Sequence, residues 1–176
     1  LCDRRQRQMC IRDRVASVND PLWMTNYELI YSHPELMLYW FPVLGNHEYN
    51  GNTQAVLDYA KISRRWCMEG RYYTKEFTVD KTGTTIRLVF VDTAPMIDKY
   101  RNNKEEYPDA GKQDMNRQFE WIDSALTVNK STWTIVLGHH PVYAETGKAE
   151  GERLDMQTRL NPILKKHKVD MYVCGH

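Results

Sequence analysis

Three apolar runs of this chain end in the same way, and this repetition constrains the possible folds more than any other feature. They read FPVL-GNHE, TIVL-GHH and MYVC-GH, so Asn46, His139 and His176 each follow a glycine directly. Ligands of open α/β sheets bind beyond the carboxyl ends of strands, and we therefore expect these three side chains to meet at one place. The glycines would let the backbone turn sharply and leave room for an ion.

The chemistry of these side chains indicates a metal site. Asparagine offers a neutral amide oxygen and histidine a neutral imidazole nitrogen, a mixed donor set that suits Zn, Fe or Mn. A single histidine after a strand is more often a hydrogen-bonded structural residue. Three such endings in order reinforce one another, and they favour metal binding.

The remaining pattern alternates strands with helices and predicts an α/β layered fold, to which one hairpin adds antiparallel character. We expect strands at 38–44, on both sides of a turn at Asp80–Gly83, at 133–137 and at 169–174. Helices are expected from Asp20-Pro21 onward and at 53–66, 113–126 and 152–167, the last with a break at Pro162. Residues 93–112 are polar and irregular, which predicts a long loop.

Composition limits the class of protein. A chain of 176 residues with 41% hydrophobic and 27% charged residues is typical of one globular domain. No apolar run approaches the roughly 20 residues of a membrane-spanning helix. Residues 15–176 hold two cysteines, Cys67 and Cys174, which form neither a CxxC metal motif nor a disulfide framework.

The first residues, LCDRRQRQMCIRDR, differ from the rest because five arginines stand against two aspartates. Such a run can be a basic arm for nucleic acid. However, MCIRDR resembles a translated sequencing-adapter fragment, and we therefore predict that residues 1–14 are not native. Without them, nothing else in the sequence indicates a nucleic-acid partner.

In combination, the motifs resemble those of the calcineurin-like metallophosphoesterase superfamily. GNHE at 45–48, VLGH at 136–139 and CGH at 174–176 match three of its blocks in the right order. The stretches GNHEYNGNTQAVLDYAKISRRW, GHHPVY and LKKHKVDMYVCGH are closest to the small, tartrate-resistant type of purple acid phosphatase. The resemblance covers almost all of residues 15–176.

The resemblance implies a layered β-sandwich flanked by helices and a site of two metal ions, Fe plus a divalent Zn, Fe or Mn. Asn46, His139 and His176 would ligate the divalent metal of this pair. His47 would face the substrate as the catalytic residue, either protonating the departing alkoxide or holding phosphoryl oxygens. His140 departs from the aromatic residue usual in this type, so it would contact phosphate or pack beside the site.

The resemblance also implies that residues 15–176 are part of a catalytic domain truncated at both ends. No D-x-G and no G-D-x-x-Y block precedes residue 15, and the second histidine of G-H-x-H would lie two positions beyond His176. The other metal would take its ligands from those blocks. We therefore expect this chain to be inactive by itself.

The function implied is hydrolysis of small phosphate monoesters by a bacterial-type acid phosphatase that is secreted, periplasmic or associated with the envelope. A phosphodiesterase or pyrophosphatase of the same superfamily is an alternative. A non-catalytic, degenerate metal-binding domain is another. Against the last, Asn46, His47, His139 and His176 are all present.

Overall fold

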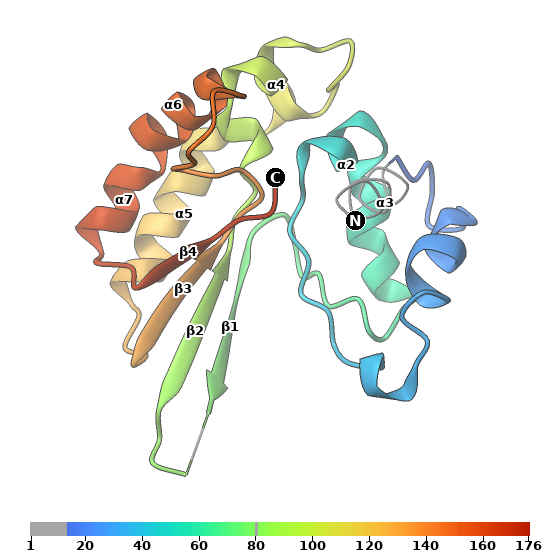
Figure 1. The fold of residues 1–176 in the computed structure, drawn as a ribbon, viewed down its shortest axis with the longest axis horizontal. Helices are drawn as coiled ribbons and strands as arrows, with labels where there is room; N and C mark the ends of the chain where they lie inside the picture. The colour runs from blue at the N-terminus through green and yellow to red at the C-terminus, as the bar shows by residue number, and fades with distance from the viewer. Residues whose placement is uncertain (1–13, 80) are drawn as a thin grey trace.

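A four-stranded mixed sheet lies between groups of helices in our computed structural model, which describes residues 14–79 and 81–176 (Figure 1). Its strands are β1 (Tyr73–Thr78), β2 (Thr85–Phe90), β3 (Trp133–Leu137) and β4 (Met171–Val173), and they lie in that order. β1 pairs antiparallel with β2, whereas β2, β3 and β4 are parallel. The α/β class and the antiparallel hairpin are therefore confirmed.

The hairpin turns where its composition predicts. The amide of Val79 donates to the carbonyl oxygen of Thr84 at 2.8 Å, and Gly83 has a φ of +87°. Asp80, the first residue of the predicted turn, lies outside the described residues. The same is true of residues 1–13, which include all but Arg14 of the segment predicted to be non-native.

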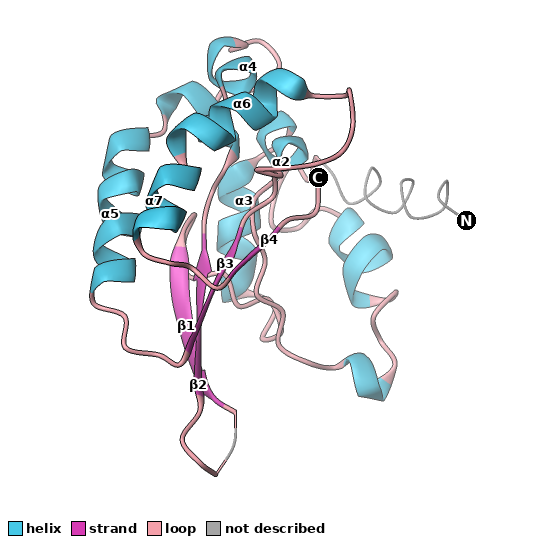
Figure 2. Ribbon diagram, turned by 60° about the vertical axis from the view of Figure 1, so that its left-hand side comes forward, coloured by secondary structure: helices cyan, strands magenta, loops and turns pink. Residues whose placement is uncertain are grey.

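Helices lie on both sides of the sheet. Figures 1 and 2 show α5, α6 and α7 on one side of it, and α2 and α3 with the preceding segment on the other. Within the described residues the α-helices are α2 (Asn46–Asn50), α3 (Thr53–Asp58), α4 (Asp98–Asn102), α5 (Met115–Thr127), α6 (Glu150–Arg159) and α7 (Asn161–Lys166). Shorter helical segments are η1 (Met24–Glu28), η2 (Pro34–Leu36), η3 (Tyr59–Lys61), η4 (Ala94–Met96) and η5 (Ala110–Lys112).

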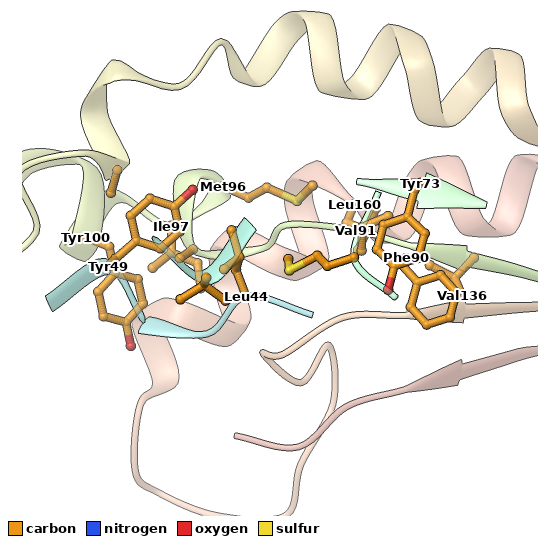
Figure 3. Close-up of a cluster of buried hydrophobic side chains, with 14 of the residues drawn as sticks. Leu44, Tyr49, Tyr73, Phe90, Val91, Met96, Ile97, Tyr100, Val136 and Leu160 are labelled. Carbon is orange, nitrogen blue, oxygen red and sulfur yellow. The ribbon is translucent and has the colours of Figure 1, made fainter. Parts of the chain in front are cut away.

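The core joins these layers. α5 buries Ile122, Ala125 and Leu126, the stripe that its 3.6-residue period predicts, and Phe119 packs against them. Leu44 and Tyr49, on either side of the GNHE segment, belong to the same buried cluster as β2, β3 and η4 (Figure 3). The segment that carries Asn46 is thus held against the sheet by apolar packing.

The predicted strand at 38–44 is wrong. Within the described residues it forms one isolated bridge, between Trp40 and Trp66, because no described strand runs beside it. Leu38 and Tyr39 are 64% and 72% exposed, and Pro42 has no amide hydrogen to donate. Leu44 is nevertheless fully buried, so the run still ends inside the core.

The predicted loop at 93–112 is also wrong, because it contains η4, α4 and η5. Three of its apolar residues, Met96, Ile97 and Tyr100, are fully buried. Helices at 53–66 and 152–167 exist but are shorter or divided, the second at Leu160, just before Pro162. Among the described residues, no helix is long and apolar enough to cross a membrane.

Candidate metal centre

The carboxyl ends of the parallel strands lie at one edge of the sheet. Leu137 pairs with Phe90 on one side and with Val173 on the other. Beyond the strands, the carbonyl oxygen of His139 accepts hydrogen bonds from the amides of Gly175 and His176, at 3.1 and 2.9 Å. His139 and His176 are therefore held side by side by main-chain hydrogen bonds.

α2 supplies the third predicted ligand. His139 Nε2 lies 3.0 Å from Asn46 Oδ1 and 3.0 Å from His176 Nδ1. The carboxyl end of the chain lies beside α2 in Figures 1 and 2. Asn46 lies close enough to Tyr107 to oppose the rise in the pKa of that hydroxyl, and Glu48 Oε2 accepts from the Gly45 amide at 2.8 Å. Asn46, His139 and His176 thus come together as predicted, and Glu48 caps the helix locally.

Gly45 is required by the close approach of the His139 ring. A Cβ at position 45 would lie 2.8 Å from ring atoms of His139, nearer than real Cβ contacts. Gly138 is similarly crowded by Thr93, whose Cγ2 would lie 2.7 Å away, and by the Tyr172 hydroxyl. At positions 45 and 138 the absent side chain makes room for neighbouring side chains, and no such crowding exists at Gly175.

We therefore expect Gly45→Ala to destabilise the chain by about 1–3 kcal/mol, because the added methyl group must displace a packed ring. Gly147→Ala is the matched control, since its Cβ would meet nothing within 4 Å. Urea unfolding of both variants measures the difference. Equal midpoints would show that the ring of His139 does not need the space beside Gly45.

The site keeps the ring of His139 neutral. Burial, together with the nearby His176 and His47, lowers the pKa of His139 to about 4. Above that pH its lone pair is available to a cation. The Coulombic effect of His47 also shows that this fourth side chain of the motif lies near the cluster.

The arrangement of the donors fits a divalent metal. Bonds of about 2.1 Å place two ligand atoms about 3.0 Å apart at a right angle and about 3.4 Å apart at a tetrahedral angle, distances close to those of the hydrogen bonds seen without a metal. The two separations around His139 Nε2 are both 3.0 Å. Neutral nitrogen and amide oxygen donors also match the ligand types of Zn, Fe and Mn.

His140 belongs to the same cluster but is fully buried. Ring nitrogens of His139, His140 and His176 all lie within 4.8 Å of one another. Thr93 Oγ1 accepts from the amides of His139 and His140 at 3.3 and 3.2 Å, and it lies 2.8 Å from His140 Nδ1. Both lone pairs of the hydroxyl are then used, so Thr93 donates its proton to Nδ1, and the proton of a neutral His140 ring is on Nε2.

That Nε2 is buried and has no hydrogen-bond partner among the described residues. A buried donor without an acceptor is costly and marks a place where a further group is expected. His140 therefore presents an N–H group, whereas Asn46, His139 and His176 are predicted to offer lone pairs.

Sequence reasoning gave no role to the residues that support this cluster. Thr93 follows β2 closely, so the strand-end rule that selected His139 also applied to it. Tyr107 and Glu152 carry no such signal, since one lies in a predicted loop and the other in the first turn of α6. Only the fold brings Glu152 Oε2 to 3.2 Å from His176 Nε2.

Comparisons with known proteins agree with this geometry. The family model of the calcineurin-like phosphoesterases matches residues 12–176. Purple acid phosphatase 3 of Arabidopsis thaliana is 33% identical over 171 residues, which cover 92% of this chain and 44% of that protein. Tartrate-resistant acid phosphatase type 5 of Sus scrofa is 28% identical over 165 residues, with 92% and 48% covered.

A solved structure has the same fold. GAP50, the anchor in the inner membrane complex of Plasmodium, superposes with a TM-score of 0.74 at 27% identity, over 93% of this chain and 52% of that one. The chain spans about half the length of the curated relatives it matches. With a family model matching nearly all of its residues, and with purple acid phosphatases among its homologues, this chain belongs to the calcineurin-like phosphoesterase family.

Proposed function

We propose that this chain contributes the divalent-metal half of a binuclear centre that hydrolyses small phosphate monoesters. The observation that carries the proposal is the convergence of Asn46 Oδ1 and His176 Nδ1 on His139 Nε2, each at 3.0 Å. When bound, a metal pair neutralises phosphate charge and activates a water molecule for attack on phosphorus. The second metal, Fe in the purple acid phosphatase type, would take its ligands from blocks that this chain does not contain.

Asn46, His139 and His176 would hold the divalent ion, Zn, Fe or Mn. Main-chain hydrogen bonds from Gly175 and His176 to the His139 carbonyl keep two of these ligands in register. Because the third ligand starts α2, its position depends on the packing of Leu44 and Tyr49 in the core. The ligands thus need little rearrangement to receive the ion.

His47 would donate a proton to the leaving oxygen or a hydrogen bond to the phosphoryl group. It follows the ligand Asn46 on α2 and lies close enough to affect the pKa of His139. His140 would add a second donor, because its buried Nε2–H has no acceptor among the described residues. Donors fixed around a phosphoryl group stabilise the charge that spreads over its oxygens.

The test is a titration of the 176-residue chain with Co²⁺, followed by ³¹P NMR of added phosphate esters. We expect about one Co²⁺ per chain and only weak hydrolysis, since one metal gives half of a two-metal centre. The bound paramagnetic ion should broaden the ³¹P line of phenyl phosphate and leave that of diphenyl phosphate sharp. Two equivalents of bound Co²⁺ with rapid hydrolysis would contradict the proposed half-site.

Substitution of His47 tests whether this residue contacts the substrate. A hydrogen bond to a charged group is worth about 1.5–3 kcal/mol, so His47→Ala should weaken phenyl phosphate binding about 10-fold or more. His33→Ala is the control, because His33 is an exposed histidine whose Nδ1 caps η2 by accepting from the Glu35 amide. Unchanged binding by His47→Ala would exclude substrate contact by this residue.

The alternatives predict different spectra. Preferential broadening of diphenyl phosphate would favour a phosphodiesterase. A non-catalytic module gains support from the likeness to GAP50, described as an anchor, and predicts Co²⁺ binding without broadening of either ester. By family resemblance we place the intact protein outside the cytoplasm. A reporter enzyme fused to the protein should then be detected outside the cytoplasm, and its retention in the cytoplasm would contradict this placement.

A further inference from the structure

Glu152 is a buried carboxylate beside the candidate metal centre. It lies in the first turn of α6 and is 4% exposed. Three side chains surround its oxygens. Lys99 Nζ lies 2.7 Å from Oε1, the Tyr100 hydroxyl 2.9 Å from Oε2, and His176 Nε2 3.2 Å from the same Oε2. An ionised carboxylate only accepts hydrogen bonds, so Lys99 and Tyr100 are donors, and the His176 contact is a hydrogen bond when Nε2 carries a proton.

That hydrogen bond decides which nitrogen of His176 carries a proton. Nε2 must be protonated to donate to Glu152, and in the neutral ring Nδ1 then keeps its lone pair. Nδ1 is the atom that lies 3.0 Å from His139 Nε2. The contact with Glu152 therefore directs the lone pair of His176 to the place where Asn46 and His139 converge.

Two other contacts hold Glu152 in this position. Tyr100 is fully buried, and its ring packs against His140 at a centroid distance of 5.0 Å. Lys99 is more exposed, at 62%, and neutralises the carboxylate from the solvent side. Glu152 itself lies on α6, and the two residues that hold its carboxylate, Lys99 and Tyr100, lie on α4. Neither helix is one of the strand ends that carry the predicted ligands.

We propose that Glu152 is a positioning residue for the metal centre, which orients the ring of His176 by accepting its Nε2–H. The inference rests on the metal site of the proposed function and adds a residue that no motif of the chain contains. Carboxylates that hold the second nitrogen of a metal-binding histidine fix its tautomer and orientation. Glu152 contacts neither the substrate nor the metal in this role.

The first experiment needs no substitution. Long-range ¹H–¹⁵N NMR of the metal-free 176-residue chain at pH 7.5 reads which ring nitrogen of His176 carries the proton. The proposal predicts a protonated Nε2 and a free Nδ1. A proton on Nδ1 in place of Nε2 would overturn it, whatever the behaviour of any variant.

The second experiment measures Co²⁺ affinity by absorption titration. Glu152→Met keeps much of the side-chain volume, but its sulfur accepts hydrogen bonds only weakly, and it should weaken Co²⁺ binding about 10- to 100-fold. Glu152→Gln retains one acceptor oxygen and should lie between this variant and the parent. Glu28→Met is the matched control, since Glu28 also accepts from three donors, Tyr59, Ser63 and Arg65, within a different network.

The outcomes separate the two proposals. Parental affinity in a folded Glu152→Met chain, or an equal loss in Glu28→Met, would overturn the positioning role and leave the metal site intact. Failure of the parent chain to bind Co²⁺ would overturn the metal site itself. The NMR measurement would then still decide whether Glu152 orients His176.

Discussion

His139→Ala is expected to lower the affinity of the chain for Co²⁺ by more than about 100-fold, beyond the usual effect of a residue that only supports a ligand. His139 Nε2 is the atom on which both other predicted ligands converge, each at 3.0 Å. Removing it would leave Asn46 and His176 without their common neighbour. Absorption titration with Co²⁺ measures the change.

His167→Ala is the control for this substitution. His167 is also a partly buried histidine with a polar partner, since its Nε2 lies 2.7 Å from Asp123 Oδ1. It lies after α7 and outside the cluster, so its loss should leave Co²⁺ affinity unchanged. A decrease of less than threefold in His139→Ala would remove His139 from the proposed ligands.

Asp92→Asn is expected to change the pH dependence of stability more than any other substitution considered. Asp92 is buried behind β2, accepts from the Tyr49 hydroxyl, and has an Oδ1 without a partner among the described residues. Burial raises the pKa of Asp92 from 3.8 to about 7, although Tyr49 and Arg71 oppose the shift. The folded state therefore disfavours the ionised carboxylate.

The direction of the change in stability with pH follows from the difference between the pKa values of the folded and unfolded states. A pKa raised on folding makes this group's contribution most favourable below pH 3.8, and the contribution is lost as the pH rises to about 7. A shift of roughly three pKa units corresponds to a loss on the order of 4 kcal/mol. Asparagine cannot ionise, so the variant should gain stability relative to the parent by a similar amount between pH 4 and pH 8.

Urea unfolding at several pH values from 4 to 8 tests this prediction. Asp20→Asn is the control, because backbone amides of Ala16 and Leu22 lower the pKa of Asp20 and its titration falls below this range. The stability difference between Asp20→Asn and the parent should therefore stay constant above pH 5. A constant difference for Asp92→Asn as well would show that Asp92 ionises normally in the folded chain.

Local patterns predicted those parts of the fold that depend on local interactions. In α5 the apolar residues repeat with the 3.6-residue period of a helix, and in β1 and β2 the side chains alternate with the two-residue period of a strand. Both elements were therefore found from the sequence. The segment at 38–44 has the composition of a strand, but a strand also needs a hydrogen-bonded neighbour, which composition does not reveal. The loop prediction at 93–112 gave too much weight to polar residues, although the few apolar ones fix three short helical segments.

The residues of the candidate site also fall into those that a local sequence pattern predicts and those that only tertiary contacts bring to the site. Asn46, His139 and His176 were found because each follows a buried run and a glycine, a signal that can be read one segment at a time. Glu152 and Tyr107 reach the site only through the packing of α4 and α6 and the segment between α4 and η5. Their roles depend on contacts between distant residues, and a single sequence does not encode such contacts in any local pattern.

The spacing of the three converging side chains also has a kinetic consequence. Asn46 and His139 are 93 residues apart in the sequence, and His139 and His176 are 37 apart. Closing such loops costs chain entropy before any contact compensates for it, and parallel strand pairing forms slowly for the same reason. We therefore expect the cluster to be completed late in folding, after β3 has paired with β4 and after α2 has docked on the core.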